Sequence, residues 1–391
     1  MLKAEKSINK HKQDRSGSVP LPRFTAKGED RMKTTFRWYG KGNDTVSLSD
    51  IRQIPSMHSV VWALHDLGPG EVWPVERIQE VKDQAAEYDL GIDVVESVNV
   101  HEAIKLGTAD RDEYIENYKQ TIRNLGEVGG VKVICYNFMP VFDWVRTDMA
   151  KEHEDGSTAL FYENAKIEGV DPHELFEQVK RSSRGMTLPG WEPERLEKIE
   201  ELLNAYNGVS EDDLFENLAY FLKEIVPVAE ENGIKMAIHP DDPPFPVFNL
   251  PRIVHSKENL QRIVDAVDSP SNGLTLCSGA LGSIKGNDIP DMIRTFKDRI
   301  PFAHIRNVKV YENGDFIETS HREQDGSVPI LEIMKAYHEI GFEGYMRPDH
   351  GRHLWGEESR PGYGLYDRAL GIMYMMGAWD MLEKLEKESS Q

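Results

Sequence analysis

Short apolar runs alternate with longer segments of helical spacing along most of the chain after Met32. The eight apolar runs cover residues 34–38, 59–64, 91–97, 131–136, 235–239, 273–277, 300–305 and 343–347. Continuous apolar runs of this length are typical of strands that are buried on both faces of a sheet. The pattern therefore predicts eight buried strands.

Between these runs, apolar residues recur every three or four positions, which predicts amphipathic helices. The helical segments are 74–89, 111–128, 213–232, 257–267, 288–297, 330–340 and, after the last run, 365–387. The first connection is short and contains a helical segment around 49–53. Ser256 and Asp288 are placed to cap helix starts, whereas Gly233 and Gly341 are placed to end helices in a left-handed turn.

Repeated strand–helix units require parallel strands joined by crossover helices. Eight units close most economically into a TIM (β/α)8 barrel, and a doubly wound open sheet is the alternative. We expect residues 32–391 to form this single α/β domain, with a mostly helical insertion at about 145–208 over one end of the barrel, because that stretch exceeds a normal loop. Residues 1–31 are polar and aperiodic, and we interpret them as a leader or an added, poorly packed extension.

The amino-acid composition bears on the partners and the cellular compartment of the protein. The chain has 46 Lys and Arg against 67 Asp and Glu, a formal charge of −21. This charge disfavours a nucleic-acid partner, because such proteins bind mainly through Lys and Arg side chains that neutralise phosphates. It disfavours a metallo-endonuclease on a related barrel for the same reason. Two cysteines cannot build a disulfide framework.

The sequence has neither a secretory signal nor an apolar run long enough to span a membrane. We therefore expect a soluble, cytoplasmic protein with no membrane partner. We also expect a homodimer or a higher homo-oligomer.

Polar residues stand where the predicted strands end, and the carboxyl ends of barrel strands carry the active site. These residues are Arg37, His65, Glu96, Asn137, His239, Cys277, His304 with Arg306, and Arg347 with Asp349 and His350. Core packing alone does not place so many ionisable groups at strand ends. This pattern is the strongest indication of function in the sequence.

His239, Cys277, His304 and Asp349 belong to four consecutive predicted strands, and they converge if they point into the barrel mouth. Two imidazoles, a thiolate and a carboxylate make a complete protein ligand set for a divalent transition metal, with positions left for substrate. Taken singly, a strand-end histidine is more often structural, and a buried cysteine is more often a small core residue. The metal hypothesis therefore depends on their joint placement.

Two glycine-containing segments follow strands, at 67–70 and 277–282. Neither is a dinucleotide fingerprint or a phosphate loop with its lysine, so we expect no nucleotide cofactor. Tyr363 lies in a loop on the same side of the barrel as the metal candidates. It could act on substrate, although an ordinary surface-loop tyrosine is the alternative.

Several motifs resemble those of the mannonate dehydratase family of hexuronate catabolism. They lie at residues 36–40, 136–140, 238–244, 277–279, 304–307 and 347–351. The most specific are His-Pro-Asp-Asp-Pro-Pro, which starts at His239, and Arg-Pro-Asp-His-Gly, which starts at Arg347. The resemblance runs from about Met32 to the last helix, and residues 1–31 fall outside it.

The resemblance implies a barrel similar to that of the sugar isomerases and the conversion of D-mannonate to 2-keto-3-deoxy-D-gluconate with loss of water. It also implies one divalent metal, Fe(II) or Mn(II), and the family ligands map onto His239, Cys277, His304 and Asp349. A thiolate with two imidazoles is softer than Mn(II) normally prefers, and the intrinsic affinity order favours Zn(II). The metal must therefore be identified by experiment.

This reaction removes the proton next to the carboxylate and expels a hydroxyl one carbon further on. A divalent metal on the carboxylate side stabilises the developing charge as a Lewis acid. Elimination also needs an acid and a base, and His350 and Tyr363 are our candidates, in an order that the sequence does not assign.

The candidate substrate-binding residues are Arg37, His65, Asn137, Arg306 and Arg347. Two other functions remain open at this point. An aldose–ketose isomerase on a similar barrel is disfavoured by Cys277, since such sites use harder, carboxylate-rich ligands. A non-catalytic sugar-acid-binding protein with structural histidines would bind mannonate without forming product.

Overall fold

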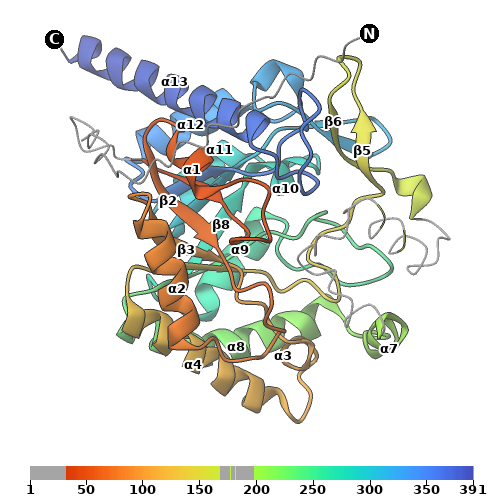
Figure 1. Cartoon of the computed structure of the whole chain (residues 1–391). Helices are drawn as coiled ribbons and strands as arrows, with labels where there is room; N and C mark the ends of the chain where they lie inside the picture. The colour runs from red at the N-terminus through yellow and green to blue at the C-terminus, as the bar shows by residue number, and fades with distance from the viewer. Residues whose placement is uncertain (1–31, 168–176, 178–180, 182–197, 391) are drawn as a thin grey trace, which may run out of the picture. The chain divides into compact units, whose positions relative to one another are not determined.

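A closed parallel barrel forms the centre of the fold. The computed structural model describes residues 32–167, 177, 181 and 198–390. Within them, eight parallel strands follow the barrel order β1-β12-β9-β8-β7-β4-β3-β2 (Figure 1). The strands are β1 (Lys33–Arg37), β2 (Met57–Trp62), β3 (Gly91–Glu96), β4 (Val133–Tyr136), β7 (Lys235–Ile238), β8 (Asn272–Cys277), β9 (Phe302–Ile305) and β12 (Tyr345–Pro348). The predicted barrel is confirmed, and the open doubly wound sheet is excluded.

Helices connect the barrel strands at nearly the predicted positions. They are α1 (Leu48–Arg52), α2 (Val75–Ala86), α3 (Glu102–Leu106), α4 (Arg111–Val128), α7 (Ile199–Ala205), α8 (Glu211–Glu231), α9 (Lys257–Ala266), α10 (Ser278–Gly282), α11 (Ile289–Thr295), α12 (Ile330–Glu339) and α13 (Tyr366–Ser389). Ser256 and Asp288 accept first-turn amide hydrogen bonds as N-caps of α9 and α11. Gly233 and Gly341 each have a φ of 64°, as a left-handed helix end requires.

The barrel interior is filled by a small apolar cluster. Its members are Val61, Val94, Val133, Cys135, Ala237, Phe302 and Tyr345, which come from six strands. Inward-facing residues of neighbouring strands stack in layers in this fold, so the interior is a packed core rather than a channel. Cys135 is therefore a core residue, whereas the strand-end groups are left for the barrel mouth.

The insertion at 145–208 was expected to be mostly helical, and this prediction is wrong for its first part. Strands β5 (Asp148–Glu152) and β6 (Thr158–Tyr162) form a hairpin that turns at Gly156, where φ is 81°. Asp-Gly between two runs with strand character is a hairpin signal. The helical part that the structure describes includes the short helix α7, and residues 168–176, 178–180 and 182–197 lie outside the described residues.

The hairpin belongs to a second sheet that the sequence pattern did not predict. Strands β10 (Val308–Val310) and β11 (Phe316–Glu318) pair antiparallel, and β11 also pairs with β6, giving the order β10-β11-β6-β5. In Figure 1, β5 and β6 lie on the side of the barrel away from α2 and α4. This sheet brings the end of β11 to the barrel mouth.

Two further expectations concern residues 1–31 and the absence of a membrane-spanning segment. The interpretation of residues 1–31 as an extension falls outside the described residues. None of the helices in the described part is both long and apolar enough to cross a lipid bilayer.

Candidate metal centre and active site

Four candidate ligands meet at the carboxyl ends of neighbouring barrel strands. His239 directly follows β7, Cys277 ends β8, His304 lies in β9, and Asp349 directly follows β12. Cys277 and His304 are register partners across β8 and β9. The strand-end pattern therefore brings these side chains together because β7, β8, β9 and β12 are adjacent in the barrel.

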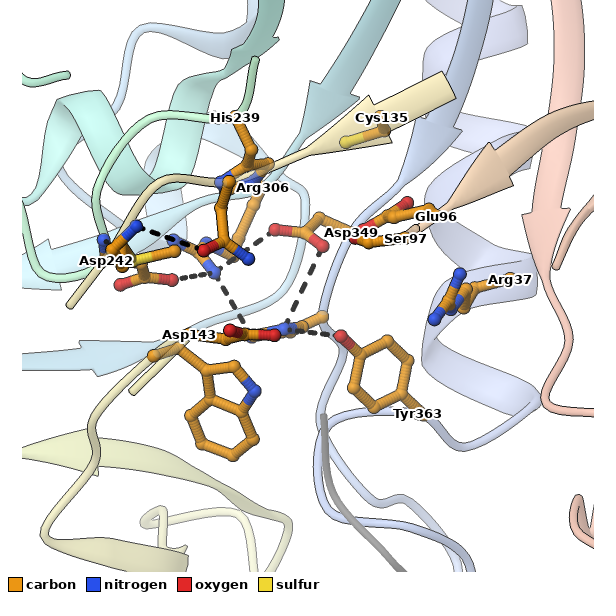
Figure 2. Close-up of a pocket in the computed structure, with 14 residues that line it drawn as sticks. Arg37, Glu96, Ser97, Cys135, Asp143, His239, Asp242, Arg306, Asp349 and Tyr363 are labelled. Carbon is orange, nitrogen blue, oxygen red and sulfur yellow. Dashed lines mark hydrogen bonds and ion pairs between the residues drawn. The ribbon is translucent and has the colours of Figure 1, made fainter. Parts of the chain in front are cut away.

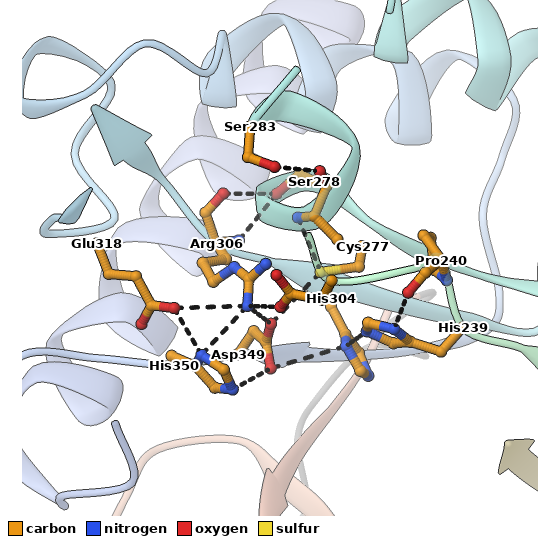
Figure 3. A network of polar contacts seen from close by, with 12 residues as sticks. His239, Pro240, Cys277, Ser278, Ser283, His304, Arg306, Glu318, Asp349 and His350 are labelled. Atoms are coloured by element: carbon orange, nitrogen blue, oxygen red, sulfur yellow. Dashed lines mark hydrogen bonds and ion pairs between the residues drawn. The ribbon is translucent and has the colours of Figure 1, made fainter. Parts of the chain in front are cut away.

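The ligand atoms of this quartet are close enough to share one cation. His239 Nε2 lies 3.2 Å from His304 Nδ1, and Cys277 Sγ lies 3.4 Å from Asp349 Oδ2. His304 Nδ1 is 3.8 Å from Asp349 Oδ1, and one ligand atom of each residue lies within 4.8 Å of all the others (Figure 3). Asp349, Cys277 and His304 are buried, and His239 is half-buried.

Contacts behind the two imidazoles orient the rings toward this centre. His239 Nδ1 lies 2.7 Å from the Pro240 carbonyl oxygen, so Nδ1 carries the proton and Nε2 is left as the ligand atom. His304 Nε2 accepts a hydrogen bond from Arg347 Nε at 3.1 Å and lies 3.4 Å from Glu96 Oε2, so the Nδ1 side of the ring faces the quartet. Partners of this kind fix the tautomer and the ring orientation of metal-binding histidines.

The protonation states of the quartet suit a cation. Burial lowers the pKa of His239, and it lowers the pKa of His304 to about 4, so both imidazoles are neutral at pH 7. Burial raises the pKa of the Cys277 thiol, which a coordinating metal would deprotonate. The donor set, with its close spacing and oriented imidazoles, fits a divalent transition metal.

A second group of potential ligands, Glu96, Cys135 and His304, lies beside the quartet. Its carboxylate is already neutralised, because Arg347 Nη2 lies 2.9 Å from Glu96 Oε1 and Arg347 Nε lies 3.1 Å from Oε2. Cys135 Sγ accepts a hydrogen bond from Thr275 Oγ1 at 3.3 Å within the barrel core. We therefore assign this group a supporting role rather than a second metal.

Arginines and carboxylates alternate on the other side of the quartet. Asp242 accepts two hydrogen bonds from Arg146, at 2.8 and 3.0 Å, and one from Arg306 Nη1 at 2.9 Å. Arg306 Nη1 also lies 3.1 Å from Asp349 Oδ2. All four side chains are buried, and the cations keep the pKa of Asp242 well below its usual range although burial alone would raise it.

His350 joins this network to Tyr363. Its Nδ1 lies 2.7 Å from Glu318 Oε1 (Figure 3), and its Nε2 lies 3.0 Å from the Tyr363 hydroxyl. Glu318 ends β11, is fully buried and also accepts from Arg146 Nη2 at 2.9 Å. Burial raises the pKa of Tyr363, so its phenol stays protonated.

Two members of the quartet, His239 and Asp349, line one pocket at the barrel mouth together with His350 and Tyr363 (Figure 2). Among the predicted binding residues, Arg37, Asn137 and Arg306 also line this pocket. His65 instead lines a neighbouring pocket, which shares Arg37 with the first. Arg347 lines neither pocket and is paired with Glu96 and Asp349, whose Oδ1 is 2.8 Å from Arg347 Nη2.

Sequence reasoning did not single out several residues of this site. Asp242 lies inside a motif that was recognised but was given no role, whereas Arg146 lies in the expected insertion. Glu318 ends the short strand Phe316–Glu318, a segment to which the sequence analysis assigned no element. The one signal in the sequence that could have indicated Glu318 is that it is an acidic residue at the end of a short apolar run.

Comparisons with known proteins agree with this geometry. The family model described as D-mannonate dehydratase (UxuA) matches residues 32–389. Mannonate dehydratase 1 of Halalkalibacterium halodurans is 63% identical over 352 residues, which are 90% of this chain and 97% of the relative. Mannonate dehydratase of Bacillus subtilis is 58% identical over 357 residues, covering 91% and 99% of the two chains.

Comparison with solved structures also matches the chain to a mannonate dehydratase. The crystal structure of mannonate dehydratase from Streptococcus suis serotype 2 superposes with a TM-score of 0.82 at 42% identity, covering 91% of this chain and 96% of that one. D-allulose 3-epimerase from a Methylomonas species, in complex with D-allulose, reaches a TM-score of 0.51 at 12% identity and covers 89% and 96%, a likeness of fold alone. On the matches of its sequence and its fold, the chain belongs to the mannonate dehydratase family.

Proposed function

We propose that this chain dehydrates D-mannonate to 2-keto-3-deoxy-D-gluconate in hexuronate catabolism, with one divalent metal as cofactor. One observation carries the proposal. Four side chains that could share one metal ion meet at the barrel mouth, and two of them, His239 and Asp349, line the same pocket as the hydrogen-bonded His350–Tyr363 pair. The names of the relatives support the substrate, and the site chemistry supports an elimination.

His239, Cys277, His304 and Asp349 would hold the metal, which we expect to be Fe(II) or Mn(II). When bound, it supplies Lewis-acid stabilisation for the negative charge that develops beside the substrate carboxylate. Arg347 supports the ligands rather than the substrate, since it is ion-paired with Glu96 and Asp349. Glu96 in turn holds the His304 ring in its orientation.

His350 and Tyr363 move the protons of the elimination. Glu318 accepts the shorter of two contacts at His350 Nδ1, which favours a proton on Nδ1 and leaves Nε2 as the acceptor that faces the Tyr363 hydroxyl. His350 Nε2 is then the base for the carbon-bound proton, and the protonated phenol of Tyr363 is the acid for the leaving hydroxyl. Loss of either group should slow turnover by about 10²- to 10⁴-fold.

Arg306 and Asn137 contribute to substrate binding from the metal side of the pocket. Arg306 brings positive charge beside Asp349, where an anionic substrate would otherwise meet the carboxylates of the site. The Asn137 side chain already accepts a hydrogen bond from the Met139 amide at 3.1 Å, which leaves its amide group to donate to a substrate hydroxyl.

The experiment is a metal-dependent product assay. Protein purified without oxygen is stripped of metal, loaded with Fe(II), Mn(II) or Zn(II), and incubated with D-mannonate while the keto-deoxy acid is quantified. We expect product with Fe(II) or Mn(II) and none in the stripped protein. The His350→Asn variant should bind metal normally and turn over slowly. Saturable mannonate binding without product under every metal would overturn the proposal.

A further inference from the structure

Among the buried side-chain atoms without a hydrogen-bond partner in the part of the chain that the structure describes, three belong to side chains that pack together on the β1–β2 side of the barrel mouth. They are Arg37 Nη1, the Tyr39 hydroxyl and His65 Nε2. The Arg37 and Tyr39 side chains are each only 2% exposed. Buried polar groups are normally hydrogen-bonded, because an unsatisfied group loses its interaction with water without compensation. Three such atoms in one place indicate a site built for a polar ligand.

The three side chains form one continuous surface. The Tyr39 ring stacks on the His65 ring with centroids 4.8 Å apart, and the Arg37 guanidinium carbon lies 4.7 Å from the Tyr39 centroid. On its other side, Tyr39 meets the edge of the Tyr363 ring at 5.0 Å. The surface is therefore adjacent to the proton-transfer residues, although none of its three members contributes to the quartet.

This surface lies across the barrel mouth from the metal ligands. Arg37 ends β1, and His65 follows β2, whereas the quartet comes from β7, β8, β9 and β12. In Figure 2, Arg37 and Tyr363 lie on the opposite side of the pocket from Asp242 and Arg306. Arg37 and Ser97 line both this pocket and the neighbouring one that contains His65. A chain-like ligand with one end at the quartet would thus place its other end here.

The chemistry of the three groups favours hydroxyls over an anion. A phenol and a neutral imidazole both donate and accept hydrogen bonds, as a hydroxyl group does, whereas Arg37 adds a donor. Burial and the nearby Arg37 and Arg360 lower the pKa of His65, so its imidazole is neutral. Glu71 and Asn99 also line the neighbouring pocket, and a carboxylate there disfavours a phosphate or a second carboxylate.

We propose that Arg37, Tyr39 and His65 form a subsite for the terminal hydroxyls of the substrate, the end remote from the metal, and that this subsite sets the preference for a six-carbon sugar acid. The inference rests on the proposed function and adds to it the residues that read chain length. Tyr39 is the informative member, because its hydroxyl has no structural partner to lose.

The test combines shortening of the side chain with shortening of the substrate. D-Lyxonate has the configuration of D-mannonate at C2, C3 and C4 but is one carbon shorter. Wild type should prefer D-mannonate, and Tyr39→Phe should lower kcat/KM for D-mannonate about tenfold while changing D-lyxonate little, the loss expected for one hydrogen bond. The matched control Tyr311→Phe changes an exposed tyrosine and should keep the wild-type preference.

Two further measurements separate this inference from its alternatives. Tyr39→Phe removes an unpaired hydroxyl, so its thermal unfolding midpoint should be equal to or above that of wild type. Equilibrium binding of both acids to the His350→Asn holoprotein reports the same preference without turnover, so it distinguishes failure of this subsite from failure of the proposed reaction. Equal losses for the two acids in Tyr39→Phe, or binding of both with equal affinity by His350→Asn, would overturn the inference.

Discussion

Replacement of Glu318 by glutamine tests how the His350–Tyr363 pair is held in place. Glu318 reaches the site from the second sheet and accepts from His350 at 2.7 Å and from Arg146 at 2.9 Å. Burial alone would raise the pKa of Glu318, but His350 and Arg146 lower it below its usual range, so the group is a carboxylate at pH 7. Glutamine keeps the volume of the side chain and removes its charge.

The size of the effect follows from this contact. A hydrogen bond to a charged group contributes about 1.5–3 kcal/mol, and each 1.4 kcal/mol is a factor of ten. In the proposed mechanism His350 takes the substrate proton, so its contact with the Glu318 carboxylate is worth most in the transition state and the loss falls there. We expect kcat of Glu318→Gln to fall about 10- to 150-fold with little change in KM, since Glu318 does not line the pocket.

The assay needs three readouts and one control. Steady-state kinetics, metal content and thermal unfolding are measured on Glu318→Gln and on Glu312→Gln, an exposed position in the turn between β10 and β11. The control should match wild type. Wild-type kcat in Glu318→Gln would refute the positioning role, and loss of metal with loss of activity would show that the network acts through Asp349 instead.

Three other perturbations probe the site. Cys277→Ser should lower metal content and activity together, as measured by elemental analysis and the product assay, and full activity with normal metal loading would remove the thiol from the site. Gly279→Ala places a Cβ into the Arg306 side chain, which must move. We therefore expect kcat/KM to fall at least tenfold and the free energy of unfolding to fall by about 1–3 kcal/mol. Wild-type kinetics and melting in this variant would contradict the close packing of Arg306 on Gly279. Burial lowers the pKa of His304 to about 4, so between about pH 7 and pH 4 the unfolded chain binds a proton that the folded, metal-free chain does not. The metal-free protein should therefore lose about 3 kcal/mol of stability in full as the pH falls through this range. Thermal melts of chelator-treated protein that stay level or rise toward acid pH would contradict this expectation.

The barrel could be predicted because its strands are parallel and buried on both faces. Such strands appear as unbroken apolar runs, and each run marks its functional end by the first polar residue that follows. Cys277 and His304 show how far this reasoning extends, since they end adjacent strands and prove to be register partners. Position in the barrel order was thus enough to place the quartet.

The second sheet could not be predicted from local patterns. Strand β11 has only three residues and is held by pairing with β6, which lies far away in the sequence, so β11 has no strand signal of its own. Glu318 was missed for this reason. Arg347 was expected to bind substrate because it is a cation at a strand end, but its direction depends on Glu96 across the barrel. Pairings of this kind appear only once the fold is known.

The central claim is that one cation is held jointly by a thiolate, two imidazoles and a carboxylate. X-ray absorption at the metal edge of the Mn(II)- or Fe(II)-loaded protein tests it directly, with Cys277→Ser as the matched sample. We expect one sulfur neighbour and imidazole scattering in the wild type, and loss of the sulfur signal alone in the variant. A coordination sphere of oxygen and nitrogen only, or identical spectra for the two proteins, would contradict it.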